Sequence, residues 1–236
     1  MAYTIAAVVA APGRLDHIPA TVRGLLMQSR APDEIVVLDQ APASRHSPAT
    51  LRFLQHHAAC GNIRLAMLAG SGACRACNCG PAFARSGILL YLRDCMPSPD
   101  LVARHLQHYC DPDVGAVGGV VISGESHDSA GHAGERPHSQ QCDREESGRG
   151  AAACLLNADN FSVRREVFIA VGGWNEHLRC NADRDLTMRL LAAGHGIVYD
   201  PEARATRSTG HGCEMTTGTR TRRPPVKAKL PDGVTS

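Results

Sequence analysis

Short apolar runs of strand length alternate with helix-like segments along the first half of the chain. The apolar runs cover residues 4–10, 34–39, 63–68, 88–92 and 114–122. Between the first two runs, Ile18, Val22 and Leu25 recur at the spacing of one helix face. The run 88–92 is apolar throughout, which is typical of a strand buried on both faces. This alternation predicts an α/β fold with a mostly parallel central sheet flanked by helices.

The second half of the chain has a different pattern. Residues 123–150 are rich in Ser, Gly, His and Glu and carry almost no large apolar side chains, so we expect a mobile loop there. Apolar spacing then predicts helices over 164–170 and 183–193 and a short strand over 196–199. We expect one domain over residues 1–212 and a basic, disordered tail over 213–236.

Composition limits the core and the partners. Of the 236 residues 43% are apolar but only 4% are aromatic, so small and branched aliphatic side chains must build the core. The net charge is +2, and the segment 220–236 alone carries +4, which leaves the remainder near −2. We therefore expect no binding to nucleic acid.

The sequence also bears on location. The N-terminus has no basic leader, and no apolar run approaches the ~20 residues that span a bilayer. We expect a soluble, cytoplasmic protein whose ten cysteines are reduced thiols.

Carboxylates stand where two of the predicted strands end. Asp39 closes the run 34–39, and Asp94 follows the run 88–92. Ligands of parallel α/β sheets bind beyond the carboxyl ends of the strands. A third carboxylate, Asp183, opens a predicted helix. A nucleotide-diphosphate sugar needs an acceptor for its base or ribose, a cation for its diphosphate and a general base for transfer, and these three residues could supply them in that order.

Several motifs extend this pattern along the chain. Residues 13–18 read Gly-Arg-Leu-Asp-His-Ile, and residues 28–39 read Gln-Ser-Arg-Ala-Pro-Asp-Glu-Ile-Val-Val-Leu-Asp. Further motifs lie at residues 72–80, 160–165, 171–176, 183–186 and 199–203. Together, in this order and over residues 3–211, they resemble family 2 glycosyltransferases, particularly a subgroup with galactosyltransferase-like domains. The resemblance implies the GT-A fold and inverting transfer of a sugar from a nucleotide-diphosphate sugar to an unidentified acceptor hydroxyl.

The resemblance also implies roles for particular residues. The nucleotide would be bound by Pro12, Gly13, Arg14, Asp39, Asn78 and Arg93. A divalent metal, Mn or Mg, would be held by Asp94 and His211. Asp183 would be the catalytic base, and Trp174 and Asn160 would contact the acceptor.

The chain departs from the family at the metal motif. The family has Asp-x-Asp at this strand end, whereas residues 92–95 read Leu-Arg-Asp-Cys. In one register Asp94 is the metal-binding aspartate and Leu92 replaces the first; in the other, Cys95 takes the metal position, where a thiolate suits Mg or Mn poorly. Alternatively, Arg93 supplies positive charge to the diphosphate directly, without a metal.

Two further departures leave a second hypothesis open. Ala182 precedes Asp183 where the family has glutamate, and Cys77 occupies an arginine position. The chain could therefore be a catalytically impaired nucleotide-sugar binder or partner subunit.

Ordinary structural roles compete with each assignment. Asp39, Asp94 and Asp183 could cap a loop, a turn and a helix, His211 could be solvated, and Trp174 could pack in the core. The Cys-x-x-Cys of Cys74 and Cys77 could suggest zinc, but no second ligand pair stands in register.

Overall fold

The computed structural model describes residues 3–11, 17–40, 46–68, 72–93, 95–123, 156–178 and 180–207. The loop expected over 123–150 lies outside these residues apart from Ser123, and the tail expected over 213–236 lies outside them entirely. The division into a domain at 1–212 and a tail therefore stays a prediction.

The described residues form an α/β fold. The strands are β1 (Ile5–Ala11), β2 (Glu34–Asp39), β3 (Arg64–Met67), β4 (Ile88–Leu92), β5 (Cys95–Pro97), β6 (Val114–Ser123), β7 (Asn160–Arg164) and β8 (Gly196–Arg207). The helices are α1 (Ile18–Leu26), α2 (Pro48–Ala59), α3 (Ala73–Asn78), α4 (Gly80–Phe83), α5 (Leu101–Gln107), η2 (His108–Cys110), α6 (Arg165–Ala170) and α7 (Ala182–Ala192). The bounds of β2 and β4 are those expected from the sequence, and α6 and α7 lie within one residue of expectation.

The strands join one eight-stranded sheet in the order β3-β2-β1-β4-β7-β6-β8-β5. β3, β2, β1 and β4 are parallel to one another, and β6 is parallel to β8. β7 runs antiparallel between β4 and β6, and β5 runs antiparallel on β8. One edge of the sheet therefore holds the carboxyl ends of β1 to β4, β6 and β8 and the amino end of β7. We call it the carboxyl edge.

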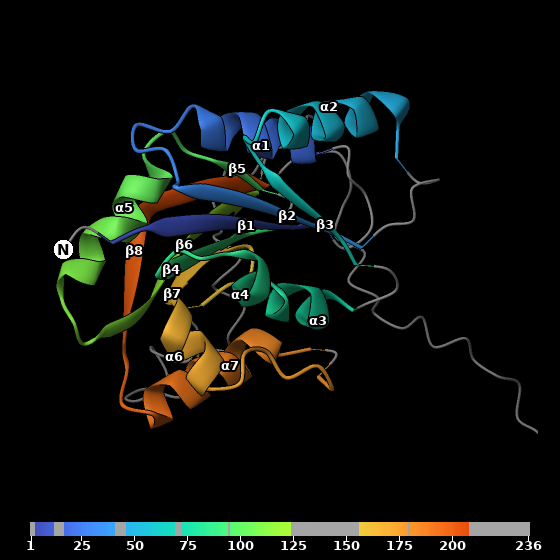
Figure 1. The fold of residues 1–236 in the computed structure, drawn as a ribbon. Helices are drawn as coiled ribbons and strands as arrows, with labels where there is room; N and C mark the ends of the chain where they lie inside the picture. The colour runs from blue at the N-terminus through green and yellow to red at the C-terminus, as the bar shows by residue number, and fades with distance from the viewer. Residues whose placement is uncertain are drawn as a thin grey trace, which may run out of the picture.

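Two hydrophobic cores cover the two faces of the sheet. β1 contributes to both, because Ile5, Ala7 and Val9 pack on one face and the alternate residues on the other. Helices α1, α2 and α5 pack on the first face, and α3, α6 and α7 on the second (Figure 1). α2 begins where Ser47 Oγ accepts the backbone N–H of Thr50 at 3.1 Å.

The sheet curls, because β4 and β5 are distant in strand order and adjacent in sequence. Three strands stand between them in the sheet, yet only residues 93 and 94 connect Leu92 to Cys95. Four spacings of a flat sheet would be about 19 Å, whereas three peptide links reach at most about 11 Å. The curl therefore brings the end of β8, where Arg207 pairs with Cys95, toward the end of β4.

β8 is longer than the strand expected over 196–199. The sequence Asp200-Pro201-Glu202 resembles a turn, but the strand continues through it with a register shift opposite Gly119 and Val120. Asn160 bridges this irregularity, because its Nδ2 donates to the carbonyls of Val120 at 3.0 Å and Ala203 at 2.9 Å. The expected end at residue 199 was therefore wrong, because a side chain from β7, two strands away in the sheet, satisfies the bulged backbone.

Among the described helices, none is both long and apolar enough to cross a membrane.

Candidate functional site

Asp39 ends β2 at the carboxyl edge, as the sequence indicates. Its side chain is 1% exposed, and its Oδ2 lies 2.9 Å from Nε2 of His46, whose side chain is also buried. The strand register places Asp39 beside Ala11 of β1, and β1 continues to β4 on its other side. Two strand spacings, roughly 10 Å, therefore separate the line of β2 from that of β4.

Arg93 lies just beyond the end of β4 and binds a carboxylate. Its Nε donates to Oδ1 of Asp159 at 2.6 Å. Asp159, 4% exposed at its side chain, immediately precedes β7. Its second oxygen, Oδ2, forms an ion pair with Nη2 of Arg207 at the end of β8. One buried carboxylate is thus held between two guanidinium groups from two different strands.

Asp183 stands in the first turn of α7, next to this ion cluster. Its Oδ2 accepts the backbone N–H of Ala158 at 3.0 Å, and its Oδ1 accepts the indole N–H of Trp174 at 3.1 Å. Burial raises the pKa of Asp183, against the lowering effect of these two hydrogen bonds and of the positive charge of Arg93. A half-buried carboxylate with a raised pKa is a stronger base than a free one.

Arg93 remains cationic despite its enclosure. Burial alone would lower its pKa, but the negative charges of Asp159 and Asp183 outweigh that effect and hold the pKa above its ordinary value. Ala158, whose N–H binds Asp183, is the chain neighbour of Asp159, which binds Arg93, so Arg93 and Asp183 lie at the same edge. The structure therefore brings together two of the predicted residues, one proposed for the nucleotide and one for catalysis.

Trp174 is a core residue with one polar contact at the site. Its side chain packs edge-on against Tyr91 and Phe161, with ring centroids 4.8 and 5.2 Å away, and the residue is 3% exposed. The ring therefore orients Asp183 through its N–H while its carbon face lies in the protein interior.

Asn78 holds the backbone that carries Trp174. Its Oδ1 accepts the N–H of Trp174 at 2.8 Å, and its Nδ2 donates to the carbonyl of Trp174 at 2.9 Å and to Glu176 at 3.0 Å. Gly173, with φ of +63°, leaves room for this contact, because a Cβ there would lie 2.5 Å from Oδ1 of Asn78. The carboxamide is thus engaged by protein, and the nucleotide contact predicted for Asn78 stays a prediction.

Asn160 is fully buried and its carboxamide is engaged on both sides. Besides the two carbonyls that bracket the β8 irregularity, its Oδ1 contacts Nε2 of His105 at 3.1 Å. These contacts occupy the polar atoms of the side chain within the protein. The acceptor contact predicted for Asn160 stays a prediction.

The cysteines of α3 border the same site. Cys77, which occupies the family's arginine position, is 3% exposed, and burial raises the pKa of its thiol to about 12. Cys74 is partly exposed, and burial together with the charge of Asp183 raises the pKa of its thiol. Both are therefore neutral thiols at pH 7, and a neutral thiol is a poor metal ligand. Within the part of the chain that the structure describes, no three His, Cys, Asp or Glu side chains gather as metal ligands would.

Several predicted site residues lie outside the described ranges. They are Pro12, Gly13, Arg14, Asp94 and His211. Their roles stay predictions.

Three residues at the carboxyl edge were not anticipated from the sequence. Asp159 directly precedes the motif at 160–165, which is a signal that could have found it. Arg207 lies eight residues past the expected end of its strand, and only the true length of β8 places it at this edge. His46 has no signal in the sequence, because its contact with Asp39 depends on the packing of the segment before α2.

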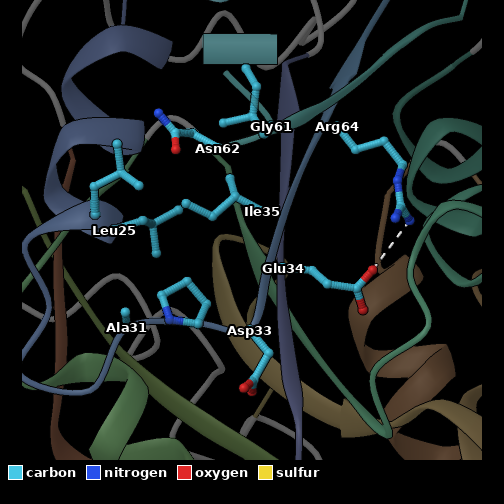
Figure 2. A pocket seen from close by; sticks show the side chains of 11 residues that line it. Leu25, Ala31, Asp33, Glu34, Ile35, Gly61, Asn62 and Arg64 are labelled. Atoms are coloured by element: carbon cyan, nitrogen blue, oxygen red, sulfur yellow. Dashed lines mark hydrogen bonds and ion pairs between the residues drawn. The ribbon is translucent and has the colours of Figure 1, made fainter. Parts of the chain in front are cut away.

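The described residues line more than one cavity, and one of about 440 Å³ lies beside Asn78, Phe168 and Gly173. Another of about 420 Å³ opens at the opposite edge of the sheet, between the end of α1 and the beginnings of β2 and β3 (Figure 2). Leu25 and Ile35 form its apolar wall, and Glu34 and Arg64 pair across its rim at 3.2 Å. Its polar groups are already paired, and ligands of parallel sheets bind at the carboxyl ends of strands. We therefore place the candidate site at the carboxyl edge.

Comparison with known proteins identifies the family. The model of a family described as glycosyltransferase like family 2 matches residues 2–224. The chain therefore belongs to family 2 of the glycosyltransferases. No match was found among curated proteins.

A solved structure shares the fold. It is a mannosyltransferase from Pyrobaculum calidifontis in complex with GDP-Man and Mn²⁺, 15% identical in sequence, with a TM-score of 0.62. The match covers 87% of this chain and 57% of that one, so this chain spans a little over half the length of its structural relative. The fold expected from the sequence, GT-A, is confirmed, whereas the galactosyltransferase-like subgroup stays a prediction.

Proposed function

We propose that this chain transfers a sugar from a nucleotide-diphosphate sugar to an acceptor hydroxyl, with Asp183 as the general base. The proposal rests on one observation: Asp183 and Arg93 both lie next to Asp159 at the carboxyl edge. Membership of family 2 supports nucleotide-sugar transfer as the reaction class. The structural relative binds GDP-Man, which supports a nucleotide sugar as the donor.

The roles follow from the positions of the side chains. Asp39, two strands away, would contact the base or ribose, and Arg93 would face the diphosphate. Asp183 would accept the proton of the acceptor hydroxyl while that oxygen bonds to the anomeric carbon and the bond from carbon to the phosphate oxygen breaks. Attack opposite the leaving group inverts the anomeric centre, so we propose an inverting transfer.

The two residues proposed to bind a divalent metal lie outside the part of the chain that the structure describes. Asp94 and His211 would hold it. The described carboxylates do not fit a metal, because Asp159 is shared between Arg93 and Arg207 and Asp183 accepts two N–H groups. The positive charge proposed at the diphosphate is therefore that of arginine.

The test is release of nucleoside diphosphate from a panel of UDP, GDP and dTDP sugars, with Mn²⁺ and with EDTA, in the presence and absence of candidate acceptors. The expected result is turnover of at least one donor by the wild-type chain and its loss in Asp183→Asn. Full turnover in that variant would exclude Asp183 as the base.

A binder without turnover is the second candidate. It is favoured by the neutral Cys77 thiol in the family's arginine position, since that residue cannot supply charge to a phosphate. Tight binding of nucleoside diphosphate with no turnover of any donor would support it, and turnover with any acceptor would exclude it.

A further inference from the structure

Arg207 is another cation at the carboxyl edge besides Arg93, among the described residues, and it has no role in the reaction proposed above. It ends β8, and its Nη2 contacts Oδ2 of Asp159, while Arg93 uses the other oxygen of the same carboxylate. The two arginines come from strands that only the curl of the sheet brings together.

The exposure of the three groups shows where the positive charge faces. The side chain of Asp159 is 4% exposed, but those of Arg93 and Arg207 are 30% and 20% exposed. Arg93 uses its Nε and Arg207 one Nη on Asp159, and a guanidinium carries five N–H donors, so each arginine keeps donors that this contact does not use. The exposed parts of both arginine side chains can therefore contact a bound ligand.

Asp183 adds a second negative charge near Arg93, so two arginines face two carboxylates, but Asp183 is hydrogen-bonded away from the guanidinium groups. Its two oxygens accept N–H groups from Ala158 and Trp174, and no ion pair joins it to Arg207 among the described residues. Its carboxylate is therefore held on the side of α7, whereas the guanidinium groups lie at the ends of β4 and β8.

We propose, on the basis of the function proposed above, that Arg207 and Arg93 together bind the diphosphate of the nucleotide donor. A guanidinium group can donate two parallel N–H bonds to the oxygens of a phosphate. Two guanidinium groups on either side of one carboxylate can therefore each bind one phosphate of a diphosphate. The two arginines should therefore bind a nucleoside diphosphate more tightly than the nucleoside that lacks the phosphates.

The test measures the affinity of the full chain for UDP and GDP and for uridine and guanosine by calorimetry, with Mn²⁺ and with EDTA. In Arg207→Ala we expect the affinity for the preferred nucleoside diphosphate to fall about 10- to 100-fold, the range for a lost hydrogen bond between charged groups. The affinity for the nucleoside should not change. Arg207→Lys should recover part of the loss, because it restores the charge without the fork.

Arg204→Ala is the matched control, because Arg204 lies on the same strand, is half exposed and pairs with Glu202 at 2.9 Å. It should bind both ligands as the wild type does. Equal affinity of wild type and Arg207→Ala for nucleoside diphosphate would overturn the proposal. A wild-type chain that binds no nucleoside diphosphate would instead overturn the proposed function itself.

Asp159→Asn separates ligand binding from strand anchoring. If Arg207 binds phosphate, removal of the competing carboxylate should preserve or raise the affinity for nucleoside diphosphate while lowering the melting temperature. If Arg207 only anchors β8 to Asp159, Asp159→Asn should lose affinity in parallel with Arg207→Ala, which would contradict the proposal.

Discussion

The indole N–H of Trp174 donates to Oδ1 of Asp183 across 3.1 Å, which links the aromatic core on one face of the sheet to the candidate catalytic base. A hydrogen bond to an ionised carboxylate favours its charged form and lowers its pKa. The backbone on both sides of the indole is in turn fixed by Asn78. The orientation and the basicity of Asp183 therefore depend on the packing of a residue that is itself 3% exposed.

Trp174→Phe should change the pH dependence of sugar transfer. The variant keeps an aromatic ring in the core but removes the hydrogen bond, so the pKa of Asp183, already raised by burial, should rise further. A general base must be deprotonated, so the rate falls as pH falls through its pKa. The acid limb of the kcat against pH profile should therefore move to higher pH in the variant. An unmoved acid limb would show that Asp183 is not the group that titrates.

Asp183→Asn should reduce kcat by about 10²- to 10⁴-fold, the usual contribution of a general base. Affinity for nucleoside diphosphate should change little, because we propose that Asp183 acts on the acceptor hydroxyl. Asp185→Asn is the matched control on the same helix turn, since Asp185 pairs with Arg189 at 2.5 Å. Equal losses of kcat in both variants would indicate damage to α7 rather than loss of a base.

His105 should make stability depend on pH. The side chain is fully buried, and burial lowers its pKa to about 4, against the raising effect of its contact with Asn160. We assign its proton to Nε2, because Asn160 presents its oxygen there, which leaves Nδ1 to accept from Ser162 at 2.8 Å. The neutral form is therefore the one that the folded chain requires.

The sign of this effect follows from the depressed pKa of His105. The unfolded chain, with an ordinary histidine pKa near 6.5, binds more protons than the folded chain between pH 6.5 and pH 4. Stability from neutral His105 is present above pH 6.5 and should fall by roughly 3 kcal/mol as pH falls to 4. Urea unfolding across this range should show a shallower slope in His105→Gln. The exposed His56→Gln should keep the wild-type slope, and an unchanged slope in both variants would contradict the assignment.

Gly119→Ala should destabilise the fold. A Cβ at this position would overlap the carbonyl oxygen of Ala203 and Nδ2 of Asn160, at the place where β8 shifts register. Overpacking of this kind costs about 1 to 3 kcal/mol. Gly87→Ala is the control, since a Cβ there meets nothing within 4 Å. Chemical unfolding of both variants checks the expectation, and equal midpoints for the two would be evidence against it.

The first half of the fold could be predicted because its signals are local. Apolar runs gave β2 and β4 their bounds, and the alternation with helices gave parallel pairing. The second half could not be predicted in the same way. β7 is antiparallel within the sheet, and the pairing of β8 beyond Asp200 depends on Asn160 from another strand.

The site was predictable to a similar degree. Asp183 and Arg93 were found because they stand in motifs, and the structure brings them together at one edge. Asp159 and Arg207 were missed, because their pairing arises from the curl that joins strands distant in sheet order. The roles of Asn78 and Asn160 as internal clamps also depend on partners 96 and 43 residues away, respectively.

The most direct measurement is the structure of the chain crystallised with UDP or GDP. We expect the base beside Asp39 and the diphosphate beside Arg93 and Arg207, with Asp183 facing the position of the sugar. A nucleotide bound instead in the cavity between Leu25 and Arg64, at the opposite edge of the sheet, would contradict this expectation.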